Sequence, residues 1–82
     1  MLTIYSKPAC PFCDMAKQYL QQQAIPFDVK DISIDNEARE FVLSEGHRTV
    51  PQIYKDGVLF VQGGYQGLSR LTESELKERA GI

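Results

Sequence analysis

The spacing of apolar and polar residues divides the first third of the chain into two strands and a helix. Residues 2–5 form a short β-prone run, and residues 27–32 form another, in which Phe27 and Val29 alternate with charged side chains. Between these runs, residues 11–23 place apolar side chains at helical spacing and polar side chains on the opposite side. The pattern therefore predicts a strand, a helix and a second strand.

The first predicted helix begins at a proline, directly after a cysteine. Pro11 suits the first turn of a helix, because its missing N–H would have no partner within the helix. Cys10 therefore lies at the junction between strand and helix. The apolar stripe predicts that four side chains pack inward: Met15, Ala16, Tyr19 and Leu20.

A second helix is predicted over residues 36–45, with Asp35 as its cap and Gly46 as its stop. Its inward positions are Ala38, Phe41 and Val42. Residues 50–55 and 58–61 then flank an Asp-Gly pair, the turn sequence typical of a two-residue hairpin. The chain thus continues with a helix and two antiparallel strands.

The last segment, residues 65–80, is helical in character and contains a second helix-start signal. Thr72 followed by Glu75 makes a capping box in the middle of this segment, so we expect the helix to be broken there. Gly81 is expected to end it.

This order of elements predicts a four-stranded mixed sheet. A strand-helix-strand start requires a right-handed parallel crossover, and the hairpin adds two antiparallel strands. We expect an α/β fold of the thioredoxin-like type, with the sheet flanked by three helices, in a single domain spanning residues 1–82.

Composition and charge exclude some classes of binding partner. The chain has 82 residues, 43% hydrophobic and 24% charged, which is typical of a domain with a packed core. Its nine basic and eleven acidic residues are scattered, without the basic stripe that binds nucleic acid. No apolar run approaches the ~20 residues of a membrane span, and the N-terminus carries no export signal. We therefore expect a cytoplasmic protein that binds neither nucleic acid nor membranes.

Both cysteines of the chain lie within four residues, at Cys10 and Cys13. A disulfide across so short a loop stabilises a fold little, and in a reducing cytoplasm such a pair indicates reactivity or metal binding. Zinc normally takes four ligands, and His47 is the one further soft donor here, so we expect no metal site within one chain. His47 itself is interpreted as an exposed loop residue.

Cys10 is the predicted nucleophile. The thiolate is the reactive form of cysteine, and the N–H groups and dipole of a helix start favour that form. Lys7 can add a cation three residues upstream. Cys13 lies one turn later on the same face in a more buried position, so its thiol is expected to stay protonated until it resolves a mixed disulfide formed by Cys10.

Four motifs in order resemble those of glutaredoxins over essentially the whole chain: Ile4-Tyr5-Ser6-Lys7, Cys10-Pro11-Phe12-Cys13, Thr49-Val50-Pro51 and Gly63-Gly64. Thioredoxins proper are less similar, since they typically carry Trp-Cys-Gly-Pro-Cys and this chain has no tryptophan. The resemblance implies a glutathione-dependent dithiol oxidoreductase with glutathione as co-substrate and no bound cofactor.

The resemblance also implies a glutathione site, with six residues expected to bind the tripeptide: Lys7, Phe12, Thr49, Val50, Pro51 and Gly64. Lys7 would hold the glycyl carboxylate and Val50 would pair with the cysteinyl backbone, presented by a cis peptide bond before Pro51. Gly64 would open the helix that receives the γ-glutamyl end, and Phe12 stands where the family usually has tyrosine.

The last motif departs from the family pattern. Family members commonly follow the two glycines with a small residue and an aspartate, whereas this chain has Tyr65 and Gln66, and Gln62 replaces an apolar residue. These changes support an alternative, a glutaredoxin-like redoxin reduced by thioredoxin reductase that donates electrons to ribonucleotide reductase. A third hypothesis is a dimeric iron-sulfur carrier, against which the stiff turn at Pro11 argues. Under the oxidoreductase hypothesis we expect a monomer that acts on protein disulfides.

Overall fold

The sheet at the centre of the fold is built from four strands between Leu2 and Leu59, and the C-terminal end of the chain is helical. The computed structural model describes residues 1–81. Its elements, in chain order, are β1 (Leu2–Ser6), α1 (Pro11–Gln22), β2 (Phe27–Asp31), α2 (Asn36–Ser44), β3 (Gln52–Lys55), β4 (Val58–Leu59), α3 (Gly64–Ser69) and α4 (Glu73–Ala80). The strands lie in the order β2-β1-β3-β4.

The pairing of β1 explains the mixed character of the sheet. It runs parallel to β2, with Ile4 opposite Val29, and antiparallel to β3, with Ile4 opposite Ile53. β4 pairs antiparallel with β3 across the short turn at residues 56–57. The parallel pair requires the helical crossover that α1 supplies, as the sequence pattern predicts.

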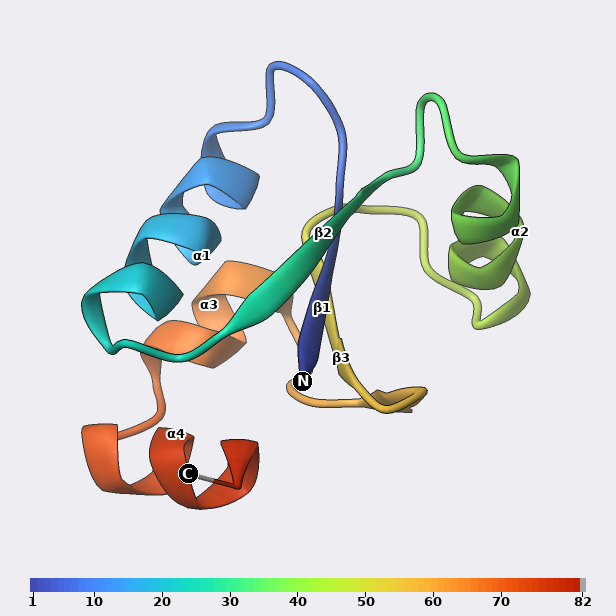
Figure 1. The fold of residues 1–82 in the computed structure, drawn as a ribbon. Helices are drawn as coiled ribbons and strands as arrows, with labels where there is room; N and C mark the ends of the chain where they lie inside the picture. Colours follow the sequence, from blue (N-terminus) through green and yellow to red (C-terminus); the bar gives the residue numbers. More distant parts are fainter. Residues whose placement is uncertain (82) are drawn as a thin grey trace.

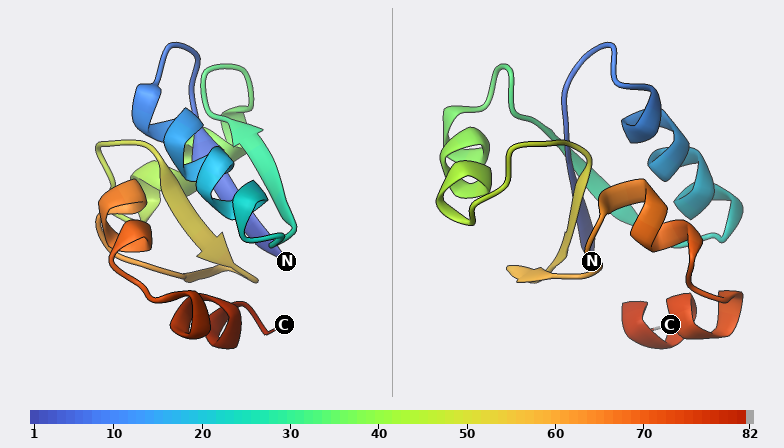
Figure 2. Two further views of the ribbon diagram at one scale, coloured as in Figure 1. Left: turned by 90° about the vertical axis from the view of Figure 1, so that its left-hand side faces the viewer. Right: turned by 180° about the vertical axis from the view of Figure 1, so that it is seen from behind.

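Helices cover both faces of this sheet. α1 and α3 lie on one face and α2 lies on the other, while α4 follows α3 below α1 (Figures 1 and 2). The side chains of β1 alternate accordingly, because successive residues of a strand point to opposite faces. Leu2 and Ile4 belong to an aliphatic core that also contains Leu20, Leu68 and other buried residues. Tyr5 belongs to a second cluster under α2.

The predicted α/β fold and four-stranded mixed sheet are confirmed, and residues 1–81 contain four helices rather than the expected three. The predicted break in the C-terminal segment separates two helices, because Thr72 caps α4 with the capping box that the sequence indicates. Gly81 adopts φ 83° at the end of α4, a left-handed conformation that glycine tolerates.

One side chain predicted to face inward, Met15, does not, and Val29 in the alternating run of β2 is exposed as well. Met15 is 40% exposed, because the buried stripe of α1 runs through Cys13, Ala16 and Leu20 and Met15 lies to its side. Val29 is 44% exposed on β2, which is an edge strand with a neighbour on one side only.

Candidate active site at the start of α1

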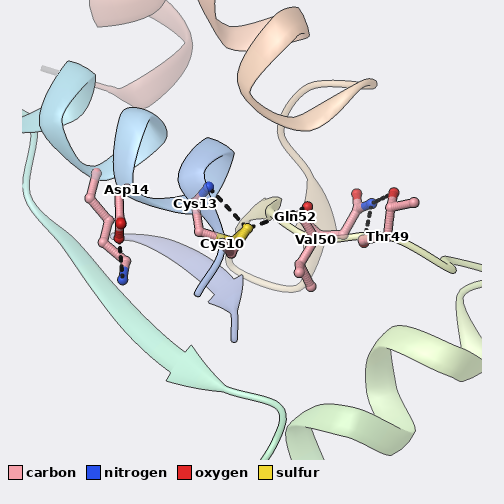
Figure 3. Close-up of a disulfide and its surroundings, with 7 residues drawn as sticks. Cys10, Cys13, Asp14, Thr49, Val50 and Gln52 are labelled. Atoms are coloured by element: carbon pink, nitrogen blue, oxygen red, sulfur yellow. Dashed lines mark hydrogen bonds and ion pairs between the residues drawn. A yellow bond between two sulfur atoms is a disulfide. The ribbon is translucent and has the colours of Figure 1, made fainter. Parts of the chain in front are cut away.

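Cys10 is the N-cap residue of α1. Its backbone is extended, with φ −115° and ψ 98°, and Pro11 occupies the first helical position. The backbone N–H of Cys13 donates a hydrogen bond to the Cys10 Sγ over 3.2 Å (Figure 3). The sulfur thus takes the place that a serine or aspartate oxygen holds at most helix starts, and it receives an otherwise unpaired helix N–H.

Cys10 and Cys13 form a disulfide, with their Cα atoms 5.2 Å apart. The two residues differ in exposure: Cys10 is 7% exposed, whereas Cys13 is fully buried. A second sulfur can therefore approach the pair from the Cys10 side. This asymmetry agrees with the predicted order of events, in which Cys10 reacts first with the substrate and Cys13 acts on Cys10.

The loop before β3 brings a backbone segment against the sulfurs. The Val50–Pro51 peptide bond is cis, as the resemblance implies, and the Val50 carbonyl oxygen lies 3.8 Å from the Cys10 Sγ (Figure 3). A buried side chain holds this loop in place. Gln52 is 7% exposed, and its Nε2 donates to the Thr49 carbonyl oxygen at 2.9 Å and to the Thr49 hydroxyl at 3.4 Å.

A groove of about 330 Å³ opens beside the disulfide. Its lining comes from α1, the loop before β3 and the start of α3: Phe12, Thr49, Val50, Pro51, Gly63, Gly64, Tyr65 and Gln66. The groove brings together five of the six residues predicted to bind glutathione. The structure thus places these five side by side, while their role in binding stays a prediction.

Lys7, the sixth predicted residue, lines a neighbouring cavity of about 110 Å³. This cavity shares Thr49 and Val50 with the groove, and its other lining residues are Ile32, Arg39, Val42, Leu43, His47 and Arg48. The two cavities therefore meet at the Thr49–Val50 backbone. Lys7, Arg39 and Arg48 give the smaller cavity three cationic side chains, whereas no charged side chain lines the groove. A ligand that crosses Val50 therefore meets two different environments.

Gly64 allows α3 to pack closely against the cis-proline. Its φ is 57°, and a Cβ at this position would lie 2.5 Å from the Pro51 carbonyl oxygen, closer than real Cβ atoms approach. Gly63 before it has φ 85°. Any larger residue at position 64 would push α3 away from the loop that holds Val50, so the glycine pair sets the width of the groove.

These features match a known family. The glutaredoxin family model matches residues 2–60, which include both cysteines and the Thr49-Val50-Pro51 motif. The chain belongs to the glutaredoxin family. The match ends before Gly63, so the two glycines, Tyr65 and Gln66 lie outside it.

Curated relatives include two kinds of small glutaredoxin. The chain is 40% identical over 60 residues to the glutaredoxin-like protein NrdH of Lactococcus lactis subsp. lactis (strain IL1403), covering 73% of this chain and 83% of that one. It is 38% identical over 56 residues to glutaredoxin 3 of Escherichia coli (strain K12), covering 65% of each chain. Membership of the glutaredoxin family implies thiol-disulfide oxidoreductase activity, and the chain carries a Cys10–Cys13 pair that forms a disulfide.

Solved structures agree on the fold. A buckwheat glutaredoxin-glutathione complex superposes with a TM-score of 0.78 at 19% identity, covering 98% of this chain and 76% of that one. Wheat glutaredoxin superposes with a TM-score of 0.79 at 24% identity, covering 98% of this chain and 78% of that one.

No helix of residues 1–81 is both long and apolar enough to cross a membrane.

His47 is half-buried in this glutaredoxin, so the expectation of an exposed loop residue is wrong. Its Nε2 lies 2.6 Å from the Tyr54 hydroxyl oxygen, which also contacts Glu45 at 3.5 Å. Burial raises the pKa of Tyr54 above its ordinary value, and the nearby Glu45 carboxylate adds to this. His47 therefore ties the end of the α2 loop to β3, a structural role that loop position alone does not indicate.

Sequence reasoning did not assign Arg39 or Tyr65 to the site. Arg39 lies on α2, 32 residues from Lys7 in the chain, and only the packing of α2 against the loop at residues 47–50 brings it to the same cavity. Tyr65 was identified only as a departure from the family pattern. A usable signal was its position directly after the two glycines, which places it in the first turn of α3 beside the groove.

Proposed function

We propose that this chain is a glutathione-dependent thiol-disulfide oxidoreductase that reduces protein disulfides and glutathione mixed disulfides. The position of Cys10 carries the proposal: its sulfur caps α1, accepts the Cys13 N–H and lies at the open side of the pair, beside the groove. A helix start of this kind stabilises a thiolate, which is the attacking species.

The chemistry balances as a two-electron exchange. The Cys10 thiolate attacks one sulfur of the substrate disulfide, a bond forms between Cys10 and that sulfur, and the other substrate sulfur leaves as a thiolate that takes a proton. The Cys13 sulfur, having lost its proton, then attacks Cys10 and releases the second substrate thiol. The substrate gains two electrons and the enzyme is left with the Cys10–Cys13 disulfide. Two glutathione molecules would restore the dithiol and become one glutathione disulfide.

The two cavities support glutathione as the reductant. The tripeptide carries a cysteine in its middle, so it can cross Val50 with its sulfur next to Cys10. Its glycyl carboxylate would then reach the cavity with Lys7, Arg39 and Arg48, where cationic side chains bind a carboxylate well. These three side chains are the strongest structural support for a glutathione site.

The groove at the other end favours a second candidate, the redoxin reduced by thioredoxin reductase. The γ-glutamyl end of glutathione bears an ammonium and a carboxylate, yet the residues that line this end, Tyr65 and Gln66 among them, carry no charge. Charged groups that lose water without a charged partner bind weakly. The relatives named glutaredoxin-like protein NrdH support the same candidate. Its electron acceptor would be ribonucleotide reductase.

A coupled assay separates the two candidates. The oxidised protein is mixed either with glutathione, glutathione reductase and NADPH or with thioredoxin reductase and NADPH, and NADPH consumption is followed with a disulfide substrate. Turnover with glutathione supports the proposal. Turnover with thioredoxin reductase alone would replace it with the redoxin function.

The Cys13→Ser variant adds a check on the route of the electrons. Reduction of a glutathione mixed disulfide needs only Cys10 when glutathione itself resolves the intermediate, so this variant should retain that activity. It should lose the reduction of protein disulfides that depends on Cys13.

We place the activity in the cytoplasm, where thiols are kept reduced.

A further inference from the structure

Two aromatic side chains form one wall of the groove beside Cys10. Phe12 lies on α1, two residues after Cys10, and Tyr65 lies in the first turn of α3. Their rings stack with centroids 6.3 Å apart and planes inclined by 28°. Phe12 is 51% exposed, so the pair presents an apolar surface to solvent in the groove that Val50 also lines, and the Val50 carbonyl oxygen lies 3.8 Å from the Cys10 Sγ.

The surroundings of this pair determine what it can bind. None of the eight residues that line the groove carries a charge. Beyond Thr49 and Val50, the neighbouring cavity has Lys7, Arg39 and Arg48 in its lining. An extended segment that places its sulfur at Cys10 therefore has an uncharged aromatic wall on one side of Val50 and cationic side chains on the other.

We propose that Tyr65 is a specificity-determining residue: with Phe12 it binds an apolar side chain next to the cysteine of a protein disulfide. The occupant is thus an extended stretch of the substrate protein, with an apolar residue on the flank that faces α3. This inference rests on the proposed dithiol chemistry of Cys10, and it holds whichever reductant restores the enzyme.

The energetics favour such a segment over a charged one. An apolar side chain on the two rings loses contact with water on its apolar face, which stabilises the complex. An aspartate in the same place would lose water without gaining a cation, since the arginines and Lys7 line the other cavity. We expect the apolar flank to raise kcat/KM roughly tenfold over an aspartate flank, the order of effect given by partial burial of one leucine side chain.

A set of short peptide disulfides tests the preference. Each peptide has one cysteine between alanines, and one flanking alanine at a time is replaced by leucine or aspartate. Protein reduced beforehand and freed of reductant is mixed with each disulfide, and the rate constant of a single turnover is measured. Wild type should prefer leucine to aspartate at one flank by roughly tenfold. If the leucine and aspartate peptides react at equal rates whichever flank carries the substitution, the proposal is overturned.

Variants then assign the preference to the aromatic wall. In Tyr65→Ala the ratio of leucine to aspartate rates should fall to about twofold or less, and Tyr65→Phe should keep most of the ratio because its ring remains. Val58→Ala is the matched control, since Val58 is 69% exposed on β4 and lines no part of the groove. A wild-type ratio in Tyr65→Ala would also overturn the proposal, as would loss of the ratio in Val58→Ala.

A trapped complex gives a readout that does not depend on rates. The Cys13→Ser variant cannot resolve the mixed disulfide that Cys10 forms, so the complex with the leucine peptide accumulates. Nuclear Overhauser contacts between the leucine methyls and the rings of Tyr65 and Phe12 are expected in this complex. If the complex forms without these contacts, the placement is wrong although the dithiol chemistry stands. If no mixed disulfide forms at all, the proposed function itself fails.

Discussion

The first turns of α1 and α4 are held by the same kind of hydrogen bond, with different consequences. At α1 the Cys13 N–H lies 3.2 Å from the Cys10 Sγ, and at α4 the Glu75 N–H lies 3.1 Å from the Thr72 Oγ1. In both cases the cap residue accepts from the residue three positions later. The two helix starts therefore share the same capping bond, and α4 adds the return bond of a capping box.

Their surroundings differ. Cys10 is 7% exposed and Cys13 is fully buried, whereas Thr72 and Glu75 are both exposed. Partial positive charge at a helix start acts more strongly where water is excluded, because the local dielectric is lower. The buried start can thus ionise a thiol, while the exposed start only fixes where a helix begins. Burial and the type of cap atom decide whether a helix start serves chemistry or stability.

The largest expected effect comes from changing the cap atom of α1. In Cys10→Ser the serine oxygen can accept the same Cys13 N–H, so the free energy of unfolding of the reduced protein should change little. Activity should fall to the uncatalysed background, because an alcohol does not form the mixed disulfide. Chemical unfolding and the coupled assay measure the two quantities. Residual turnover without Cys10 would show that another group attacks the substrate.

The second effect concerns the ionisation of Cys10. In the reduced protein we expect a thiol pKa below the ordinary value of about 8.5, because the helix N–H groups and the Lys7 ammonium favour the thiolate. Ultraviolet absorbance of the thiolate against pH, in the Cys13→Ser variant, measures it.

A lysine comparison separates the two causes of this shift. Lys7→Gln should raise the Cys10 pKa, while Lys77→Gln should leave it unchanged, since Lys77 lies on α4 and pairs with Glu73 at 3.0 Å. An unperturbed pKa in the Cys13→Ser protein would remove the electrostatic basis of the proposed mechanism.

Local signals in the sequence predicted both helix starts. Cys10 before Pro11 and Thr72 before Glu75 are readable because a cap depends on residues within one turn of each other. The same holds for Asp35, which caps α2 as expected by accepting the Ala38 N–H at 3.0 Å. The mixed character of the four-stranded sheet followed in turn from the hairpin signal and the crossover rule, whereas its strand order is known from the structure.

Features that depend on contacts between distant segments could not be predicted in this way. The exposure of Met15 depends on where α3 and the sheet touch α1, and the bond from His47 to Tyr54 depends on how the α2 loop folds back on β3. The Phe12–Tyr65 pair joins residues 53 positions apart, and no periodicity in either helix indicates it. Such contacts are set by packing, which local patterns do not encode.

A smaller effect is expected from the cap of α4. Thr72→Ala removes the oxygen that accepts the Glu75 N–H, so the free energy of unfolding should fall by about 1 kcal/mol, with activity unchanged. Ser74→Ala in the same exposed turn is the control, and it should stay within about 0.5 kcal/mol of wild type. If both substitutions destabilise equally, the capping bond is not the cause.

The smallest effect is the pH dependence of the same cap. The Thr72 N–H donates to the Glu75 carboxylate at 3.2 Å, and this bond is the main reason that the pKa of Glu75 lies below its ordinary value. A hydrogen bond from the Thr72 side chain is the second cause. A carboxyl whose pKa is lower in the folded state stabilises the fold above its unfolded pKa, and the stabilisation is lost as the pH falls through the folded pKa. The free energies of unfolding of wild type and Glu75→Gln are measured from neutral pH into the acid range. Wild type should be the more stable of the two at neutral pH, and the two values should converge in acid. A constant difference across this range would mean that Glu75 acts through packing rather than through its charge.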